Sequence, residues 1–135
     1  MSDDRYRFKD RYVPQQPELP EGFAYPQEFL DIMSTPEIIN IVPWWFLGEE
    51  KELAVFWDGV LKEQCRTQVL VPFAKKDDES DLIVAFDGSD KSGDPKILLI
   101  HAYTRPGWEN RGEWSTFTEW LTSAKRDAQL FRENN

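Results

Sequence analysis

His101 and Cys65 are the only histidine and the only cysteine in the chain, so they are the first residues to test for catalysis. A thiol and an imidazole can form a nucleophilic dyad, and a serine or a nearby carboxylate could also work with His101. No recognisable motif surrounds either residue, however, and a pair of suitable types alone is weak support for a hydrolase. We expect His101 to pack against an aromatic turn and Cys65 to be a partly buried thiol. The sequence therefore predicts a protein that is not an enzyme.

Two acidic segments could in principle hold a hard cation. They are DDESD (Asp77–Asp81) and DGSDKSGD (Asp87–Asp94). The second lacks the alternating ligands and the final bidentate glutamate of a calcium loop. There is also no Cys/His spacing for zinc and no glycine loop for phosphate. We expect these carboxylates to be solvated in turns, with no metal and no cofactor.

The segment PGWENRGEW contains Trp108, Arg111 and Trp114, residue types that are enriched in protein-binding hot spots. Alternatively, both indoles pack on a sheet and Arg111 stacks over one of them. Core packing is favoured for Trp114, whereas both alternatives stay open for Trp108 and Arg111. Together with the acidic turns, this segment gives the candidate partner-binding residues, which are Asp77, Asp78, Glu79, Asp87, Asp90, Trp108 and Arg111.

The charge balance indicates what kind of partner these residues would meet. The chain has 135 residues, with 25 acidic against 16 basic side chains and a net charge of −9. Such a field repels nucleic acid and anionic membranes, and it speeds encounter with a basic protein. The acidity could also serve solubility alone.

Composition indicates the compartment. One cysteine excludes an intramolecular disulfide, the N-terminus lacks an apolar signal-peptide core, and no apolar run approaches a membrane span. We expect a cytoplasmic protein with a single domain over residues 1–135.

These side chains must be positioned by a sheet. Residues 66–74, 81–86 and 96–103 are rich in β-branched and aliphatic side chains, which predicts strands. The connections between them are short and turn-rich, so an antiparallel meander is expected. Because the strands are apolar almost throughout, helices should cover both faces.

Helices are predicted on both sides of these strands in the chain. One starts near Tyr25 with Pro26 in its first turn, and its apolar face is Phe29, Leu30 and Met33. A second, within residues 49–64, should bury Leu53, Phe56, Trp57, Val60 and Leu61, although Gly59 could end it at Asp58. A third starts at Ser115 or Thr116, where Thr116 and Glu119 have capping-box spacing. Its expected buried face is Phe117, Trp120, Leu121, Ala124, Ala128 and Phe131.

The remaining segments are an arm and an apolar run. Residues 1–18 are polar and contain prolines, which indicates an extended arm whose Tyr6, Phe8 and Tyr12 could add an edge strand. PWWFL (Pro43–Leu47) should lie in or beside the core, with Trp44 and Trp45 as core residues like Trp57. The expected fold is α+β, with an antiparallel sheet of about four to six strands flanked by N-terminal and C-terminal helices.

Several of these segments resemble one known family. LPEGFAYPQEFLDI, PWWFL, LVPFAKKDDESDLIVAFDG and PGWENRGEWSTFTEWL, in this order over Leu19–Lys125, resemble the SUKH superfamily. The most specific parts are PFA followed by an acidic strand end, and the G-W-E-x-R-G turn before an F-x-x-W-L helix. The resemblance implies an antiparallel sheet with helices at the two ends of the chain. It also implies a non-catalytic immunity protein that neutralises a cognate toxin by binding it.

An acidic immunity protein would suit a basic toxin, such as a nuclease. The alternative is an intracellular scaffold or regulatory module, because the superfamily includes relatives of a fungal cell-wall assembly regulator. A toxin gene beside this one would favour immunity, and its absence would favour the scaffold.

Overall fold

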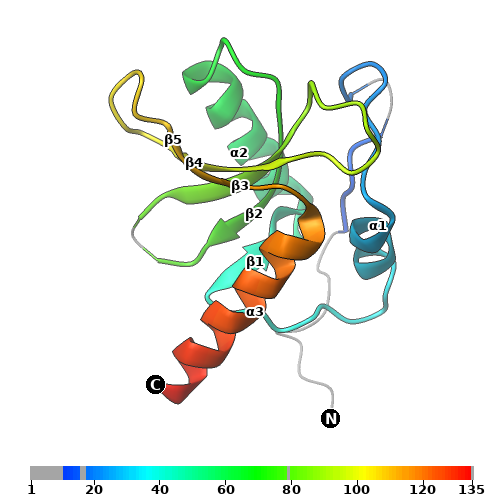
Figure 1. The fold of residues 1–135 in the computed structure, drawn as a ribbon, viewed down its shortest axis with the longest axis vertical. Helices are drawn as coiled ribbons and strands as arrows, with labels where there is room; N and C mark the ends of the chain where they lie inside the picture. Colours follow the sequence, from blue (N-terminus) through cyan, green and yellow to red (C-terminus); the bar gives the residue numbers. More distant parts are fainter. Residues whose placement is uncertain (1–10, 16–17, 79, 135) are drawn as a thin grey trace.

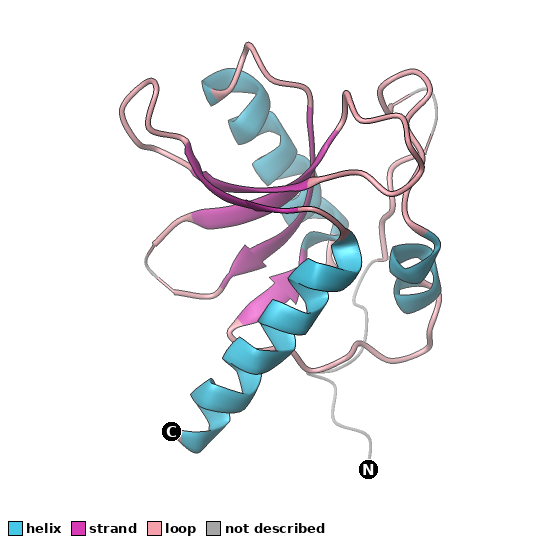
Figure 2. Ribbon diagram, in the orientation of Figure 1, coloured by secondary structure: helices cyan, strands magenta, loops and turns pink. Residues whose placement is uncertain are grey.

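The structure is a computed structural model that describes residues 11–15, 18–78 and 80–134. Its elements, shown in Figures 1 and 2, are α1 (Gln27–Met33), β1 (Trp44–Phe46), the 3₁₀ helix η2 (Leu47–Glu49), α2 (Lys51–Gln64), β2 (Leu70–Lys76), β3 (Leu82–Asp87), β4 (Ile97–His101), β5 (Asn110–Trp114) and α3 (Phe117–Glu133). The arm residues 11–15 carry no regular secondary structure, and Tyr6 and Phe8 lie outside the described residues.

The strands form one antiparallel sheet in the order β1-β2-β3-β4-β5. The expected meander of β2, β3 and β4 is confirmed, and so is the α+β class. Two strands were not predicted. PWWFL was expected only to be core, but its central residues pair with β2 as β1, with Phe46 opposite Ala74. The segment expected to be a loop contributes β5, where Glu113 lies opposite Leu98. Since the residues of β5 are mostly exposed, it lacks the alternating pattern that identifies a strand in a sequence.

The residues of β3 and β4 alternate between the two faces of the sheet, and both faces are covered. On β3, Val84 and Phe86 pack in the core beneath α1 and α3, whereas Ile83 and Ala85 pack beneath α2. Figure 2 shows α2 on one side of the sheet and the other two helices on the opposite side. The apolar strands are thus buried from both sides, as their composition predicts.

The α1/α3 side of the core is built from aromatic rings. The centroid of the Phe73 ring lies 4.3 Å from that of Phe86 and 4.9 Å from that of Trp120. Phe29 of α1 contacts both Phe73 and Phe117, so this helix is anchored to the sheet and to α3. The predicted apolar face of α1 is confirmed.

Helix α2 differs from its prediction in the side that it buries, and of the two possible ends the later one is found. Leu53 and Phe56, expected to be buried, are exposed, and the side facing the sheet carries Ala54, Trp57, Val60 and Leu61. Leu53–Trp57 is a continuous apolar run, so its sequence does not indicate which side faces the core. The helix also continues through Gly59 to Gln64, because packing of residues such as Leu61 on the sheet offsets the low helix propensity of glycine.

Helix α3 begins as predicted, with Thr116 as its N-cap accepting a hydrogen bond from the Glu119 amide at 3.2 Å. The Glu119 carboxylate accepts from the Ser115 amide at 3.0 Å, one residue before the position in a standard capping box. Phe131, expected to be buried, is exposed, because the last turns of α3 extend past the sheet (Figure 1).

The tryptophans follow their predictions to different degrees. Trp44 is buried, and its indole donates to Asp127 at 3.1 Å. Trp45, Trp57 and Trp114 are half-buried against the core.

Candidate functional site

The meander separates the acidic turns that were expected to form one recognition surface. The β2–β3 turn and the β4–β5 loop lie at one end of the sheet, where the Ala102 amide donates to the Asp81 carbonyl at 3.0 Å. The β3–β4 loop, with Asp87 and Asp90, lies at the opposite end, where Asp87 pairs with Leu70. Asp77, Asp78, Trp108 and Arg111 therefore share an end of the molecule, and Asp87 and Asp90 do not belong to it.

At the end of the sheet that carries the β2–β3 turn, the carboxylate of Asp78 stabilises this turn. It accepts from the Ser80 amide at 2.8 Å and from the Ser80 hydroxyl, and the Lys76 ammonium lies 3.6 Å away. Desolvation opposes ionisation of Asp78, but these hydrogen bonds and the lysine outweigh it and lower the pKa of the carboxyl group. Asp77 is exposed, with its amide donating to the Pro43 carbonyl at 2.6 Å. Glu79 lies outside the described residues.

At the far end, Asp87 and Asp90 also stabilise a loop. Asp87 accepts from the amide and hydroxyl of Ser89, at 2.9 and 2.6 Å. Asp90 accepts from the amides of Ser92 and Lys96, each at 3.0 Å. The bonds from Ser92, followed by that from Lys96, lower the pKa of Asp90. Both carboxylates have a local structural role of the kind that aspartate often plays in turns.

The β4–β5 loop presents Trp108 to solvent. Its side chain is 56% exposed, and the Arg105 guanidinium lies 5.4 Å from the ring centroid. Arg111 does not stack on this indole. Its Nε donates instead to the Trp108 carbonyl at 2.7 Å and so fixes the backbone below the ring. Of the two alternatives for Trp108, the surface position is the one found.

Two further exposed aromatic side chains lie near this loop and were not expected there. Tyr103, at the start of the loop, is 57% exposed, and Phe56 of α2 is 52% exposed. The half-buried Trp57 links these two side chains, since its ring centroid lies 5.1 Å from that of Phe56 and 6.0 Å from that of Tyr103. We refer to Phe56, Trp57, Tyr103 and Trp108, with the turn residues Asp77 and Asp78, as the aromatic end.

Lys75 of β2 supports this cluster from below. It is buried, and its ammonium lies 5.1 Å from the centroid of the Trp57 ring and donates to the Lys76 carbonyl at 3.2 Å. A cation held against an indole in a partly desolvated position is attracted by the ring quadrupole. Trp57 is thereby fixed between the sheet and the exposed aromatic rings.

His101 lies against a backbone carbonyl, and Cys65 is buried. The Nδ1 atom of the half-buried His101 lies 2.8 Å from the Ala102 carbonyl oxygen. Cys65 is buried at the end of α2, and this burial, together with the charge of Glu109, raises the pKa of the thiol. A nucleophilic cysteine needs the opposite shift.

Across the described ranges, no group of three or more histidine, cysteine, aspartate or glutamate side chains is placed to hold a metal ion. No helix among the described residues is long and apolar enough to cross a membrane.

Comparison of the chain with family models, with curated proteins and with solved structures found no match.

Proposed function

We propose that this chain is a non-catalytic, cytoplasmic immunity protein that binds a basic cognate toxin and blocks it through the aromatic end. The observation that carries the proposal is that the exposed rings of Phe56 and Tyr103, linked through Trp57, lie at the same end of the sheet as the exposed Trp108 and the acidic β2–β3 turn. The molecule that presents them has a net charge of −9. The resemblance of Leu19–Lys125 to the SUKH superfamily supports the same function.

The aromatic rings would supply most of the affinity. Tryptophan and tyrosine dominate binding hot spots because a large rigid ring buries much apolar area and loses little conformational entropy. Trp108 and Tyr103 each expose more than half of their surface. Both stand on restrained backbone, because Arg111 binds the Trp108 carbonyl and the Tyr103 amide donates to the Gln64 side chain at 2.5 Å. A preorganised loop loses less entropy on binding.

The negative field would supply speed and selectivity. Long-range attraction between an acidic and a basic protein raises the association rate, and salt screens it. Asp77 adds an exposed carboxylate at the rim of the aromatic end. Blocking a toxin by occupying its surface needs no chemical step, which agrees with the raised pKa of the Cys65 thiol.

Co-expression with the toxin encoded beside this gene tests the proposal. Cells should survive toxin induction only when this protein is present, and the purified proteins should form a complex. Survival that does not depend on this protein would reject the immunity function.

The surface is tested with Trp108→Ala and Tyr103→Ala. Each should weaken toxin binding by about 2 kcal/mol, or roughly 30-fold, because each removes an anchor ring. Phe131→Ala is the matched control, since it removes an exposed ring on α3 away from this surface. Equal losses for all three variants, measured by calorimetry, would place the interface elsewhere.

A further inference from the structure

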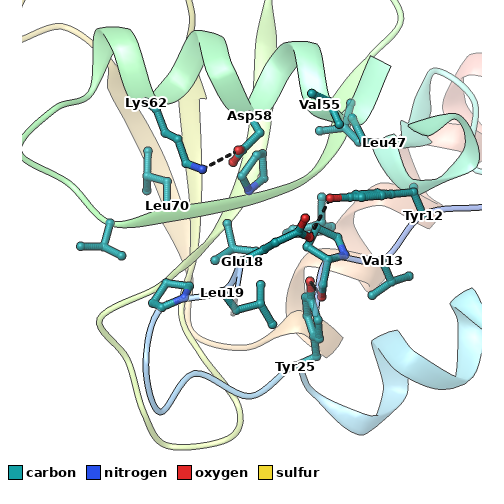
Figure 3. Close-up of a pocket in the computed structure, with 18 of the residues that line it drawn as sticks. Tyr12, Val13, Glu18, Leu19, Tyr25, Leu47, Val55, Asp58, Lys62 and Leu70 are labelled. Atoms are coloured by element: carbon teal, nitrogen blue, oxygen red, sulfur yellow. Dashed lines mark hydrogen bonds and ion pairs between the residues drawn. The ribbon is translucent and has the colours of Figure 1, made fainter. Parts of the chain in front are cut away.

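A cavity of about 580 Å³ lies between residues 12–14 and 18–20, helix α2 and residues 68–73, which include the first half of β2. Figure 3 shows it enclosed by α2 on one side and by the arm, with Tyr12 and Glu18, on the other. Its volume falls within the range of roughly 300–1,000 Å³ that is typical of small-molecule sites.

The floor of the cavity is apolar and rigid. It is formed by Phe29, Leu47, Val71 and Phe73, which are all buried and belong to the two cores. Val55 of α2 is also part of the lining, although more than half of its surface is exposed to solvent. A ligand with an apolar body would cover this surface and gain the free energy of its transfer from water.

The charged groups of the lining are mostly acidic. Glu18 accepts a hydrogen bond from the Tyr12 hydroxyl at 2.8 Å, and Asp58 forms an ion pair with Lys62 at 2.8 Å. Among the described lining residues, there are thus two carboxylates and a single ammonium group. Lys62 is largely exposed and can turn to solvent, whereas Asp58 is more enclosed.

The phenol of Tyr25 senses the same negative potential. Burial raises its pKa most, and the neighbouring Tyr12, Asp58 and Glu18 raise it further. Its hydroxyl donates to the Pro14 carbonyl at 2.9 Å, so it holds the arm over the cavity. The carboxylates of the two walls therefore act on one shared space.

We propose that this cavity binds an amphipathic small molecule. Its apolar body would lie on the floor that includes Phe29 and Phe73, and its ammonium group would lie between Glu18 and Asp58. The chemistry selects this class because the floor offers no hydrogen-bonding partner, whereas the lining carries excess negative charge. An anionic head group would face both carboxylates, and a neutral one would forgo their attraction. The inference is independent of the toxin-binding proposal, since it uses the other flank of α2.

Binding can be tested on the full chain with decylamine, decanol and decanoate below their micellar concentrations at pH 7. Isotope-edited NMR should show saturable shifts at residues 12–15, 18–20 and 54–62. Decylamine should bind at least about tenfold more tightly than decanoate, because the carboxylates of the lining attract an ammonium group and repel a carboxylate group. Decanol should bind with intermediate affinity.

Two matched pairs of variants assign the site. Val55→Trp should fill the cavity and reduce decylamine affinity at least about tenfold, whereas Phe56→Trp, on the neighbouring exposed position outside the lining, should leave it unchanged. Asp58→Asn should reduce the preference for decylamine over decanol. Asp77→Asn, at the aromatic end, changes the net charge of the protein by the same amount as Asp58→Asn. It should not alter this preference.

Three results would overturn the inference. They are the absence of saturable binding, equal affinities of amine and carboxylate, and equal effects of the two tryptophan substitutions. Comparison of Asp58→Asn with Asp77→Asn also distinguishes binding of the ammonium group at a local site from general attraction by the net charge of the protein. Loss of decylamine binding with intact toxin neutralisation would leave the proposed function in place, and the reverse outcome would leave the cavity site in place.

Discussion

Glu49 has a carboxyl group whose surroundings favour the protonated form. Burial raises its pKa from 4.5 to about 7, although the hydrogen bond that its Oε2 accepts from the Phe46 amide at 2.9 Å acts in the opposite direction. In the unfolded chain this group ionises at lower pH, so the folded state holds the proton more tightly between pH 4.5 and pH 7. The free energy of unfolding must then fall as pH rises through this window and stay reduced above it.

Glu49→Gln should remove this pH dependence. The amide oxygen can still accept from the Phe46 amide, but no charge develops at high pH. We expect the variant to gain up to about 3 kcal/mol in unfolding free energy at pH 8 and less than about 1 kcal/mol at pH 5. Urea unfolding at both pH values measures the difference, with the exposed Glu52→Gln as control. A gain of the same size at pH 5 would show that ionisation is not the cause.

Two glycines show how an element depends on its neighbours. A Cβ atom on Gly48 would lie 2.6 Å from the Tyr12 carbonyl oxygen and 2.5 Å from the Met33 side chain. The Tyr12 amide also donates to the Gly48 carbonyl at 2.9 Å, so η2 and the arm are in direct backbone contact. Gly59, within α2, has no atom within 4 Å of its Cβ position.

The same substitution should therefore have opposite effects at these positions. Gly48→Ala should lower the unfolding free energy by about 1–3 kcal/mol, because a backbone oxygen must shift. Gly59→Ala should raise it by about 1 kcal/mol through helix propensity. Denaturant titrations give both values. Hydrogen exchange of the Tyr12 amide should accelerate in Gly48→Ala alone, and unchanged exchange would mean that the arm contact survives.

For the whole molecule, charge repulsion should matter more than ion pairing. The net charge is −9, while ion pairs such as Lys62–Asp58 and Arg66–Glu63 lie at the surface. Exposed pairs of this kind contribute little, whereas a large net charge opposes compaction.

Salt should therefore stabilise the fold. Raising NaCl from about 10 to about 150 mM shortens the Debye length from roughly 30 to 8 Å and screens the repulsion. We expect the unfolding temperature to rise by a few degrees in calorimetry, with toxin association slowing over the same range. A fall in unfolding temperature would mean that the surface ion pairs outweigh the repulsion.

Local patterns were sufficient to predict the features that depend on near neighbours in the chain. Short runs rich in β-branched and aliphatic residues identify β2, β3 and β4, and Thr116 with Glu119 identifies the start of α3. The apolar face of α1 also follows from its spacing. Strand alternation, helix periodicity and capping are set by residues a few positions apart, so they can be recognised without the fold.

Long-range packing decided the rest. Strand β5 exists because β4 supplies its hydrogen bonds, and α2 turns Trp57 inward and Phe56 outward because of the shape of the sheet beneath it. The meander sends Asp77 and Asp87 to opposite ends, and the folding of the arm against α2 and β2 creates the cavity. These features depend on contacts between residues far apart in the chain, and such contacts are specified only when the whole core assembles.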